Sequence, residues 1–203
     1  MTVTIDTALS RAAGRLRIAQ HILADLQLIE RWRTFGKPIV VGAVAYGLVV
    51  APDIDIEIFC DEPKITDGFA VLRDCALHPR IRKARFANEL DGPDQGLYWQ
   101  LRYQHGDGQE WKIDMWSMQH SHPGPCSAAL VEPMKQALTD ETRQAILEIK
   151  EQALFDAKLL RGSIHLYRAV LDDGIRNVEQ FRVWLERNPA TGLIKWTPKI
   201  NAR

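Results

Sequence analysis

The sequence predicts an α/β (α+β) fold, with a small mixed sheet and its helices followed by a C-terminal helical domain. Apolar residues recur at spacings of three and four over residues 8–35, which predicts a helix. Residues 53–60 alternate strictly between polar and apolar, which predicts a half-buried strand. Beyond the proline-containing loop at residues 120–125 the pattern becomes helical. We therefore expect one domain over residues 1–122 and a second over residues 123–203.

The elements of the first domain follow in order. After the first helix, residues 38–42 predict a short buried strand, and residues 43–49 predict one or two helical turns. A helix that Thr66 would cap comes next. Three strands then follow, with the sequences RIRKARFANEL, LYWQLRYQH and EWKIDMWSM, and turn-forming segments between them predict a meander.

The second domain is expected to be helical. Thr139 is placed to cap a long helical segment that contains one or two helices. Asn177 and Gln180 have the spacing of a capping box at the start of a last helix, which would end before Pro189. The final nine residues are expected to form a tail that is either loose or docked.

Composition narrows the class of protein. The chain has 203 residues, of which 46% are hydrophobic, and equal numbers of acidic and basic residues give a formal net charge of zero. This mixture argues against disorder except at the ends of the chain, and zero net charge argues mildly against a large nucleic-acid surface. Three widely spaced cysteines favour a reducing, cytoplasmic setting. No segment is apolar over the roughly 18 residues that a membrane span needs.

Two aspartates one residue apart point to a metal site. Asp53 and Asp55 share one face of the alternating strand, whose other face is apolar. A later strand carries Asp114 between Ile113 and Met115. Like charges that converge need a cation between them, and hard oxygen ligands suit Mg²⁺. The alternative interpretation is that this pair of acids is surface charge on an edge strand.

Neighbouring residues are further candidates. The turn that begins at Gly42 and Ala43 leads into a short helix, whose backbone amides are placed to bind phosphate. Lys112 shares the strand face of Asp114 and either offsets charge near the acids or on a phosphate, or forms a simple salt bridge. Glu57 and Glu110 are weaker candidates for a general base, and we interpret both as solvated strand acids.

The segment GAVAYGLVVAPDIDIEI resembles the signature of the polymerase-β-like nucleotidyltransferase superfamily. That signature has Gly-Ser-x-Ala-x-Gly, then Asp-x-Asp or Asp-x-Glu, and a third acid on a later strand. Gly42, Ala43, Ala45 and Gly47 match its first part, the paired aspartates match its second, and Asp114 matches its third. The resemblance covers residues 39–118 and implies a small mixed sheet with helices behind it.

The resemblance implies a Mg²⁺-dependent enzyme that moves a nucleoside monophosphate from an NTP to a hydroxyl and releases pyrophosphate. Asp53, Asp55 and Asp114 would hold two Mg²⁺ ions, and Asp114 would also help to deprotonate the hydroxyl. The nearest comparison is with aminoglycoside-type adenylyltransferases, so a small-molecule acceptor is expected first, with protein or RNA as alternatives. Ala43 replaces the usual serine, whose hydroxyl contacts the triphosphate. This replacement motivates the alternative of a nucleotide-binding or antitoxin-like partner protein with weakened catalysis.

The remaining side chains have simpler interpretations. His120 and His122 are expected to be exposed loop residues, and Arg161 and His165 to lie on a salt-bridged or solvated helix face. The tryptophans are expected in the core or in subunit contacts, and a homodimer is one arrangement that would bury the Trp-containing tail. The tryptophans considered are Trp99, Trp111, Trp116, Trp184 and Trp196.

Overall fold

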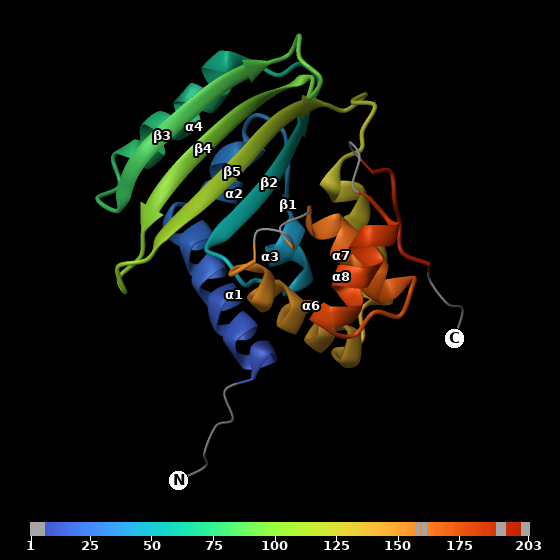
Figure 1. Cartoon of the computed structure of the whole chain (residues 1–203). Coiled ribbons are helices and arrows are strands. Elements are labelled where there is room, and N and C mark those ends of the chain that lie inside the picture. The colour runs from blue at the N-terminus through green and yellow to red at the C-terminus, as the bar shows by residue number, and fades with distance from the viewer. Residues whose placement is uncertain (1–6, 157–158, 160–161, 190–193, 200–203) are drawn as a thin grey trace.

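A five-stranded mixed sheet organises the chain, with the strand order β1-β2-β5-β4-β3 (Figure 1). The computed structural model describes residues 7–156, 159, 162–189 and 194–199. The central strands β2 and β5 are parallel, and every other neighbouring pair is antiparallel. The strands are β1 (Lys37–Val41), β2 (Asp53–Cys60), β3 (Ile81–Glu89), β4 (Gly96–Gln104) and β5 (Glu110–Gln119). The expected small mixed sheet is confirmed.

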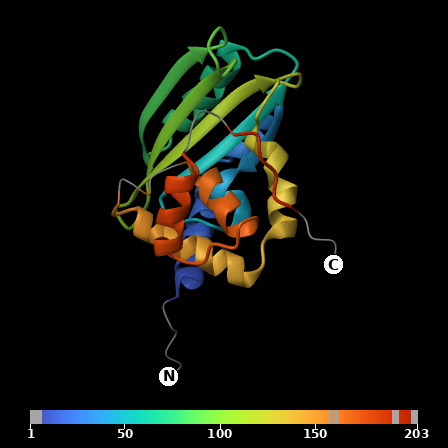
Figure 2. The same cartoon turned by 45° about the vertical axis from the view of Figure 1, so that its right-hand side comes forward.

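Helices cover one face of the sheet and one side of the molecule. Behind the sheet lie α1 (Ala8–Asp25), α2 (Leu28–Arg33) and α4 (Ile65–Ala76). The short helix α3 (Gly42–Tyr46) links β1 to the loop before β2. A group of helices lies beside the β1–β2 edge of the sheet, as Figure 2 also shows. These are the short 3₁₀ helix η1 (Ser127–Leu130), α5 (Val131–Ala137), α6 (Asp140–Ala153), α7 (Ser163–Leu171) and α8 (Val178–Arg187).

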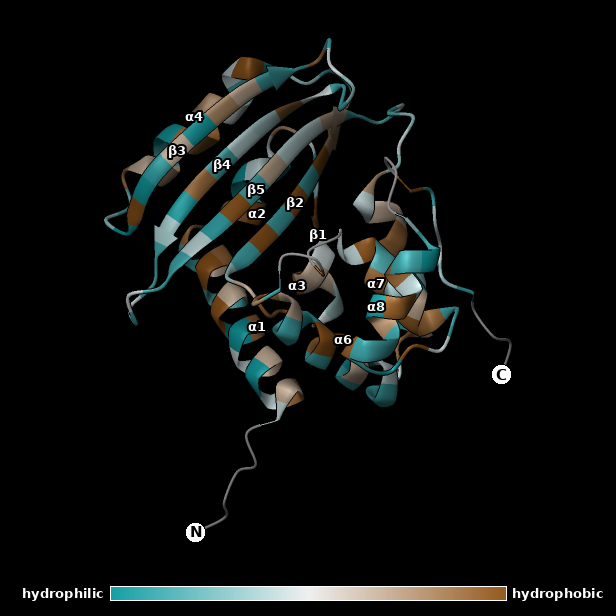
Figure 3. Cartoon of the chain, viewed as in Figure 1, coloured by the Kyte–Doolittle hydropathy of each residue, from teal (hydrophilic) through white to brown (hydrophobic). Residues whose placement is uncertain are grey.

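Two hydrophobic clusters hold these layers together. The apolar residues of β2, β4 and β5 pack against α1, α2 and α4. The largest fully buried side chains of this cluster are Trp32 of α2, Trp99 of β4 and Trp111 of β5. The alternation of polar and apolar residues along the strands is visible in Figure 3. The second cluster joins the α5–α8 helices to Val41, Tyr46 and Leu48 and to the start of α1. The domain boundary after residue 122 stays a prediction, since this core contains residues from both sides of it.

Several helix boundaries differ from the prediction. The segment 8–35 forms two helices because Gln27 adopts a left-handed backbone conformation, with φ 48°. Helix α4 begins at Ile65 after Lys64, so the prediction that Thr66 caps it was wrong. Thr139 does cap α6, and it exchanges hydrogen bonds with Thr142.

Asn177 caps α8 by accepting a hydrogen bond from the backbone N–H of Gln180 at 3.0 Å. The Gln180 side chain, however, accepts from the backbone N–H of Arg176 at 2.8 Å, one residue before the cap. The pattern of the sequence therefore located the start of the helix correctly but not the second bond. Among the described residues, no helix has the length and apolar character that crossing a membrane requires.

Gly68 gives a direct test of the packing between α4 and the sheet. A Cβ atom on Gly68 would lie 2.2 Å from the buried ring of Trp99, so alanine at this position requires the helix or the ring to move. We expect Gly68→Ala to destabilise the protein by about 1–3 kcal/mol, although alanine favours helices by about 1 kcal/mol over glycine. Gly14 in α1 is the matched control, since its added Cβ would meet only Arg17 Nη2 at 3.9 Å. Urea denaturation should show Gly14→Ala to be neutral or stabilising; a similar loss in both variants would contradict the packing argument.

Candidate active site

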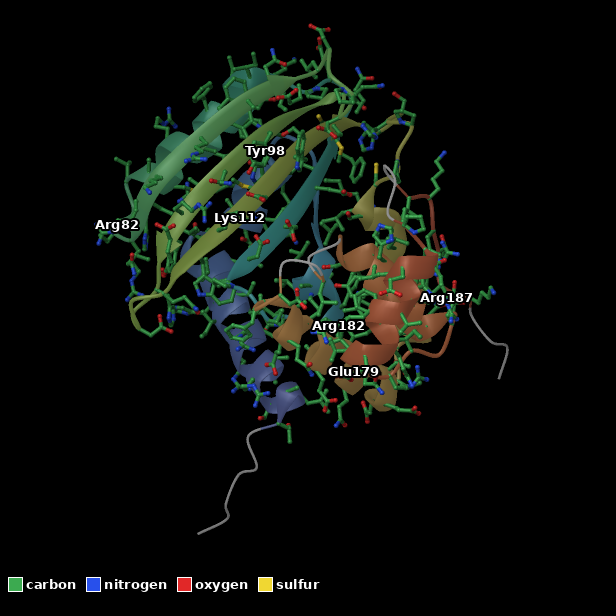
Figure 4. All side chains as sticks on the ribbon, in the orientation of Figure 1. Arg82, Tyr98, Lys112, Glu179, Arg182 and Arg187 are labelled. Carbon is green, nitrogen blue, oxygen red and sulfur yellow. The ribbon has the colours of Figure 1, made fainter. Side chains whose placement is uncertain are left out.

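The parallel pairing of β2 with β5 brings the predicted acids together. Asp53 lies opposite Lys112, and Asp55 lies opposite Asp114. Because side chains at paired positions point to the same face of a sheet, all four meet on the face opposite to α1, α2 and α4. One carboxylate oxygen from each of the three aspartates lies within 4.8 Å of the others. Figure 4 shows Lys112 on this face.

Hydrogen bonds fix Asp114 in place. Its Oδ1 accepts from the Tyr98 hydroxyl at 2.7 Å and from Gln100 Nε2 at 3.0 Å. Its Oδ2 lies 2.7 Å from Lys112 Nζ, which also lies 3.2 Å from Asp53 Oδ2. Lys112 therefore forms ion pairs with the acids, and its predicted contact with a phosphate stays a prediction.

Asp53 retains an oxygen that has no partner. Its Oδ1 is buried and forms no hydrogen bond with any described residue. A buried acceptor without a donor is costly, so this atom is suited to a ligand that the protein itself does not supply. A divalent cation bound by carboxylate oxygens fits this arrangement.

The electrostatics of the site also favour a cation. Burial, and then the charges of Asp53 and Asp114, raise the pKa of Asp55 to about 7. Burial also raises the pKa of Asp53, although Lys112 opposes this shift. Burial alone would lower the pKa of Lys112, but its hydrogen bonds and ion pairs with Asp114 and Asp53 raise it above its ordinary value. Lys112 therefore compensates the three carboxylates only in part.

Gly42 lets the chain turn tightly against Asp55. Gly42 has φ +63°, and a Cβ atom on it would lie 2.8 Å from Asp55 Oδ2. The helix α3 that starts here has only five residues. The predicted roles of Gly42 and Ala43 in phosphate binding stay predictions, whereas the close approach of the glycine backbone to Asp55 is a feature of the structure.

A pocket of about 1250 Å³ opens beside Asp53 and Asp55, between the sheet and the C-terminal helices. Gly42 and Ala43 line it, and so does Lys150 of α6. Asp114 and Lys112 are not among the described residues that line it. The acids therefore lie at the edge of the pocket, with Asp114 on the side of the open sheet face.

Lys150 is the residue that the sequence analysis missed. Its Nζ donates to the Leu48 carbonyl oxygen at 3.0 Å and lies 3.4 Å from the Tyr167 hydroxyl. Burial lowers the pKa of Lys150 to about 8, against the opposing charges of Asp55 and Asp53. A lysine beside the buried Ile149 and Ile146 of an amphipathic helix was the available signal.

Two interpretations of polar residues as solvated were wrong. Glu57 is only 8% exposed, and its carboxylate accepts from the backbone N–H groups of Ser127 and Ala128 at 2.7 and 2.8 Å. It therefore anchors η1 to the sheet. His165 is 6% exposed and lies inside the helical group, which contradicts the solvated alternative for this residue. Its predicted neighbour Arg161 lies outside the described residues.

The other candidates mostly agree with their interpretations. Glu110 is partly exposed, and its Oε1 lies 3.7 Å from Arg102 Nη1. His120 is exposed, whereas His122 is half-buried at the pocket, where its Nδ1 accepts from the Gly124 N–H at 3.0 Å. Trp99, Trp111 and Trp184 are buried in the core, as expected, and Trp116 and Trp196 are half-buried.

The turn at Gly42 can be tested against a matched glycine. Both Gly42 and Gly108 have positive φ, at +63° and +88°, but an added Cβ would meet nothing within 4 Å at Gly108. We expect each change to alanine to cost about 1–2 kcal/mol of stability from the backbone alone. Only Gly42→Ala should also abolish Mn²⁺ binding, measured by calorimetry, because it displaces Asp55. Equal Mn²⁺ binding by the two variants would contradict this role of Gly42.

Comparison with known proteins identifies solved structures that have a similar fold. No protein-family model matches the sequence, and no curated protein matches it. The structure is similar to Cid1 poly(U) polymerase bound to MgGTP, with a TM-score of 0.60, 13% identity, and coverage of 78% of this chain and 50% of that chain. It is also similar to a cytoplasmic RNA terminal U-transferase, with a TM-score of 0.52, 13% identity, and coverage of 77% and 46%.

A third similar structure is Cid1 in complex with its short product ApU, with a TM-score of 0.51, 11% identity, and coverage of 85% of this chain and 48% of that chain. The chain thus spans about half the length of the solved structures that it matches. At these identities the likeness concerns the fold. With the acids of β2 and β5 in one cluster, the chain has the fold of the polymerase-β-like nucleotidyltransferases that its sequence motif predicted.

Proposed function

We propose that the protein is a Mg²⁺-dependent nucleotidyltransferase, which transfers a nucleoside monophosphate from an NTP to a hydroxyl of an acceptor and releases pyrophosphate. The observation that carries the proposal is the cluster of Asp53, Asp55 and Asp114 oxygens within 4.8 Å of one another at the edge of a large pocket. The similarity to structures described with MgGTP and with a UTP analogue supports it. The acceptor stays a prediction, with a small molecule expected first and protein or RNA as alternatives.

The residues present fit the proposed metal. Asp53 Oδ1 is buried without a partner among the described residues, and the three ligand groups are hard oxygen donors. Asp53, Asp55 and Asp114 would hold two Mg²⁺ ions. When bound, the ions would neutralise charge on the triphosphate and on the attacking oxygen.

Other residues of the chain would bind the phosphates and orient the Asp114 carboxylate. Lys150, which lines the pocket, is placed to attract the triphosphate. The backbone at Gly42 and Ala43 would approach the same phosphates. Tyr98 and Gln100 hold the Asp114 carboxylate in one orientation by their hydrogen bonds to Oδ1. Such fixed orientation matters because misplacement of a reacting group is costly to the rate.

The bonds exchanged define the reaction. The acceptor hydroxyl oxygen forms a bond to the α-phosphorus, and the bond from that phosphorus to the bridging oxygen of the β-phosphate breaks. Pyrophosphate leaves with the electrons of that bond. The hydroxyl proton passes to the Asp114 carboxylate or to water.

Substitution of the paired aspartates tests the proposal. Asp53→Asn/Asp55→Asn should abolish Mg²⁺-dependent binding of ATP, GTP, CTP or UTP in calorimetry. Pyrophosphate release over a panel of aminoglycoside, peptide and RNA acceptors should fall by at least about 100-fold, since several kcal/mol of transition-state stabilisation is lost. Asp61→Asn removes an exposed acid just after the same strand and should change neither quantity. Nucleotide binding that needs no Mg²⁺ and survives the double substitution would refute the metal-dependent reaction.

Ala43 motivates the second candidate function, a nucleotide-binding partner protein with weakened catalysis. Ala43 lines the pocket beside Asp53 and Asp55 and offers no side-chain donor where related enzymes have serine. Ala43→Ser should tighten NTP binding by about tenfold or more, because a hydrogen bond to a charged group contributes about 1.5–3 kcal/mol. An enzyme should release pyrophosphate with either residue at this position. Tight nucleotide binding by both proteins, with pyrophosphate released by neither, would favour the binding protein.

A further inference from the structure

Cationic side chains extend from the acids across the open face of the sheet. The register places Lys112 of β5 opposite Arg102 of β4, and Arg102 opposite Lys83 of β3. Two residues further along each strand, on the same face, Asp114 of β5 lies opposite Gln100 of β4, and Gln100 lies opposite Arg85 of β3. We call each such line of opposite residues across the strands a row. Because adjacent strands are about 4.8 Å apart, the row from Lys112 to Lys83 spans about 10 Å. We call Lys112, Arg102, Lys83 and Arg85 the cationic strip.

The outer part of the strip has no compensating acids. Lys83 and Arg85 are exposed and form no ion pair with any described residue. Arg102 donates to Gln100 Oε1 at 3.2 Å and lies 3.7 Å from the half-exposed Glu110. Cations on an edge strand such as β3 also protect it against pairing with other chains. That role does not explain Arg102 and Lys112, which lie on interior strands.

An aromatic pair lies beside the strip. Tyr98 of β4 and Trp116 of β5 are directly opposite, in the row next to Asp114 and Gln100. Their ring centroids are 5.0 Å apart, and both side chains are half-buried on the face that carries the acids. Figure 4 labels Tyr98 on this face, above Lys112, and shows Arg82 at the outer end of β3. Aromatic rings next to cations are the usual means of binding single-stranded nucleic acid.

The pocket and the strip lie on different sides of the acids. Asp53 and Asp55 line the pocket, which the proposed function assigns to the NTP. Asp114 and Lys112 belong to the sheet face beyond it, where Tyr98, Gln100 and Arg102 are their neighbours. An acceptor on the sheet face would therefore approach the acids from the side opposite to the bound nucleotide. In-line displacement needs this arrangement, since the attacking and leaving oxygens lie on opposite sides of the phosphorus.

We propose that the acceptor is the 3′ end of a single-stranded nucleic acid, with its phosphates along the cationic strip and a base against Trp116. The inference rests on the proposed function and narrows its acceptor. Charge complementarity favours this occupant, because the exposed Lys83 and Arg85 would attract phosphates and repel a cationic aminoglycoside. The 3′-hydroxyl oxygen forms the new bond to the α-phosphorus of the NTP, pyrophosphate leaves, and the hydroxyl proton passes to Asp114 or water. The strand grows by one nucleotide.

Binding of an oligonucleotide to the full chain tests this inference. The probe is a short fluorescein-labelled single-stranded oligoribonucleotide of mixed sequence, and fluorescence anisotropy is followed over a series of salt concentrations. Lys83→Ser/Arg85→Ser should lower the slope of log affinity against log salt by about 0.7 for each cation that contacts a phosphate. Trp116→Leu should weaken binding at least about fivefold at fixed salt.

A control variant and a measurement of NTP binding distinguish failure of this inference from failure of the proposed function. Arg17→Ser/Arg187→Ser removes two exposed arginines from α1 and α8, away from this face, and should leave the slope unchanged. Neither pair should alter Mg²⁺-dependent binding of a non-hydrolysable NTP. With NTP and Mg²⁺, the wild-type protein should extend an oligonucleotide that has a 3′-hydroxyl and not one that ends in a 3′-phosphate.

Two results would overturn the inference. One is an equal loss of oligonucleotide affinity in the Lys83/Arg85 and Arg17/Arg187 variants. That result would show that binding depends on positive charge anywhere on the surface and not on the cationic strip. The other is transfer to a small molecule or peptide with no oligonucleotide bound or extended, which would leave the nucleotidyltransferase proposal intact. Failure to bind any Mg²⁺-NTP would instead refute the proposed function, and the acceptor assignment with it.

Discussion

The parallel pairing of β2 with β5 is the constraint on which the site depends. Strand β2 alone can present Asp53 and Asp55, because residues two apart share a face. Only the register that sets Asp55 opposite Asp114 adds the third carboxylate. A slip of one residue would turn Asp114 toward the core and bring Met115 to the site. The buried isoleucines of β2 and β5 fix this register, since they fill the cluster shared with α1, α2 and α4.

That arrangement places repelling charges together, and the surroundings limit the cost. Lys112 bridges Asp53 and Asp114, while Tyr98 and Gln100 donate to the free side of Asp114. No residue in the described part of the chain is a comparable donor to Asp55, and burial with two neighbouring acids raises its pKa to about 7. The incomplete compensation is the physical reason to expect a bound cation. Gly42 brings only backbone close to Asp55, because a Cβ atom there would lie 2.8 Å from Asp55 Oδ2.

The sequence predicted what local patterns determine. Alternation identified β2, and an acid between apolar neighbours identified Asp114 as a residue that needs a partner. Lys150 and the anchoring role of Glu57 could not be predicted in this way, because each depends on contact with a distant segment: Lys150 with Leu48, and Glu57 with Ser127 and Ala128. The break at Gln27 was missed because the apolar spacing continues through it. His165 is buried only because α7 packs inside the helical group.

In the function proposed here, Asp53, Asp55 and Asp114 form a divalent-metal site that holds the triphosphate at the edge of the pocket. A crystal soaked with Mn²⁺ and a non-hydrolysable NTP tests this site most directly, since anomalous scattering locates the ions. We expect Mn²⁺ peaks within about 2.3 Å of carboxylate oxygens of these aspartates, with the triphosphate extending toward Lys150. Ordered nucleotide without Mn²⁺ at these oxygens, or Mn²⁺ bound elsewhere, would contradict it.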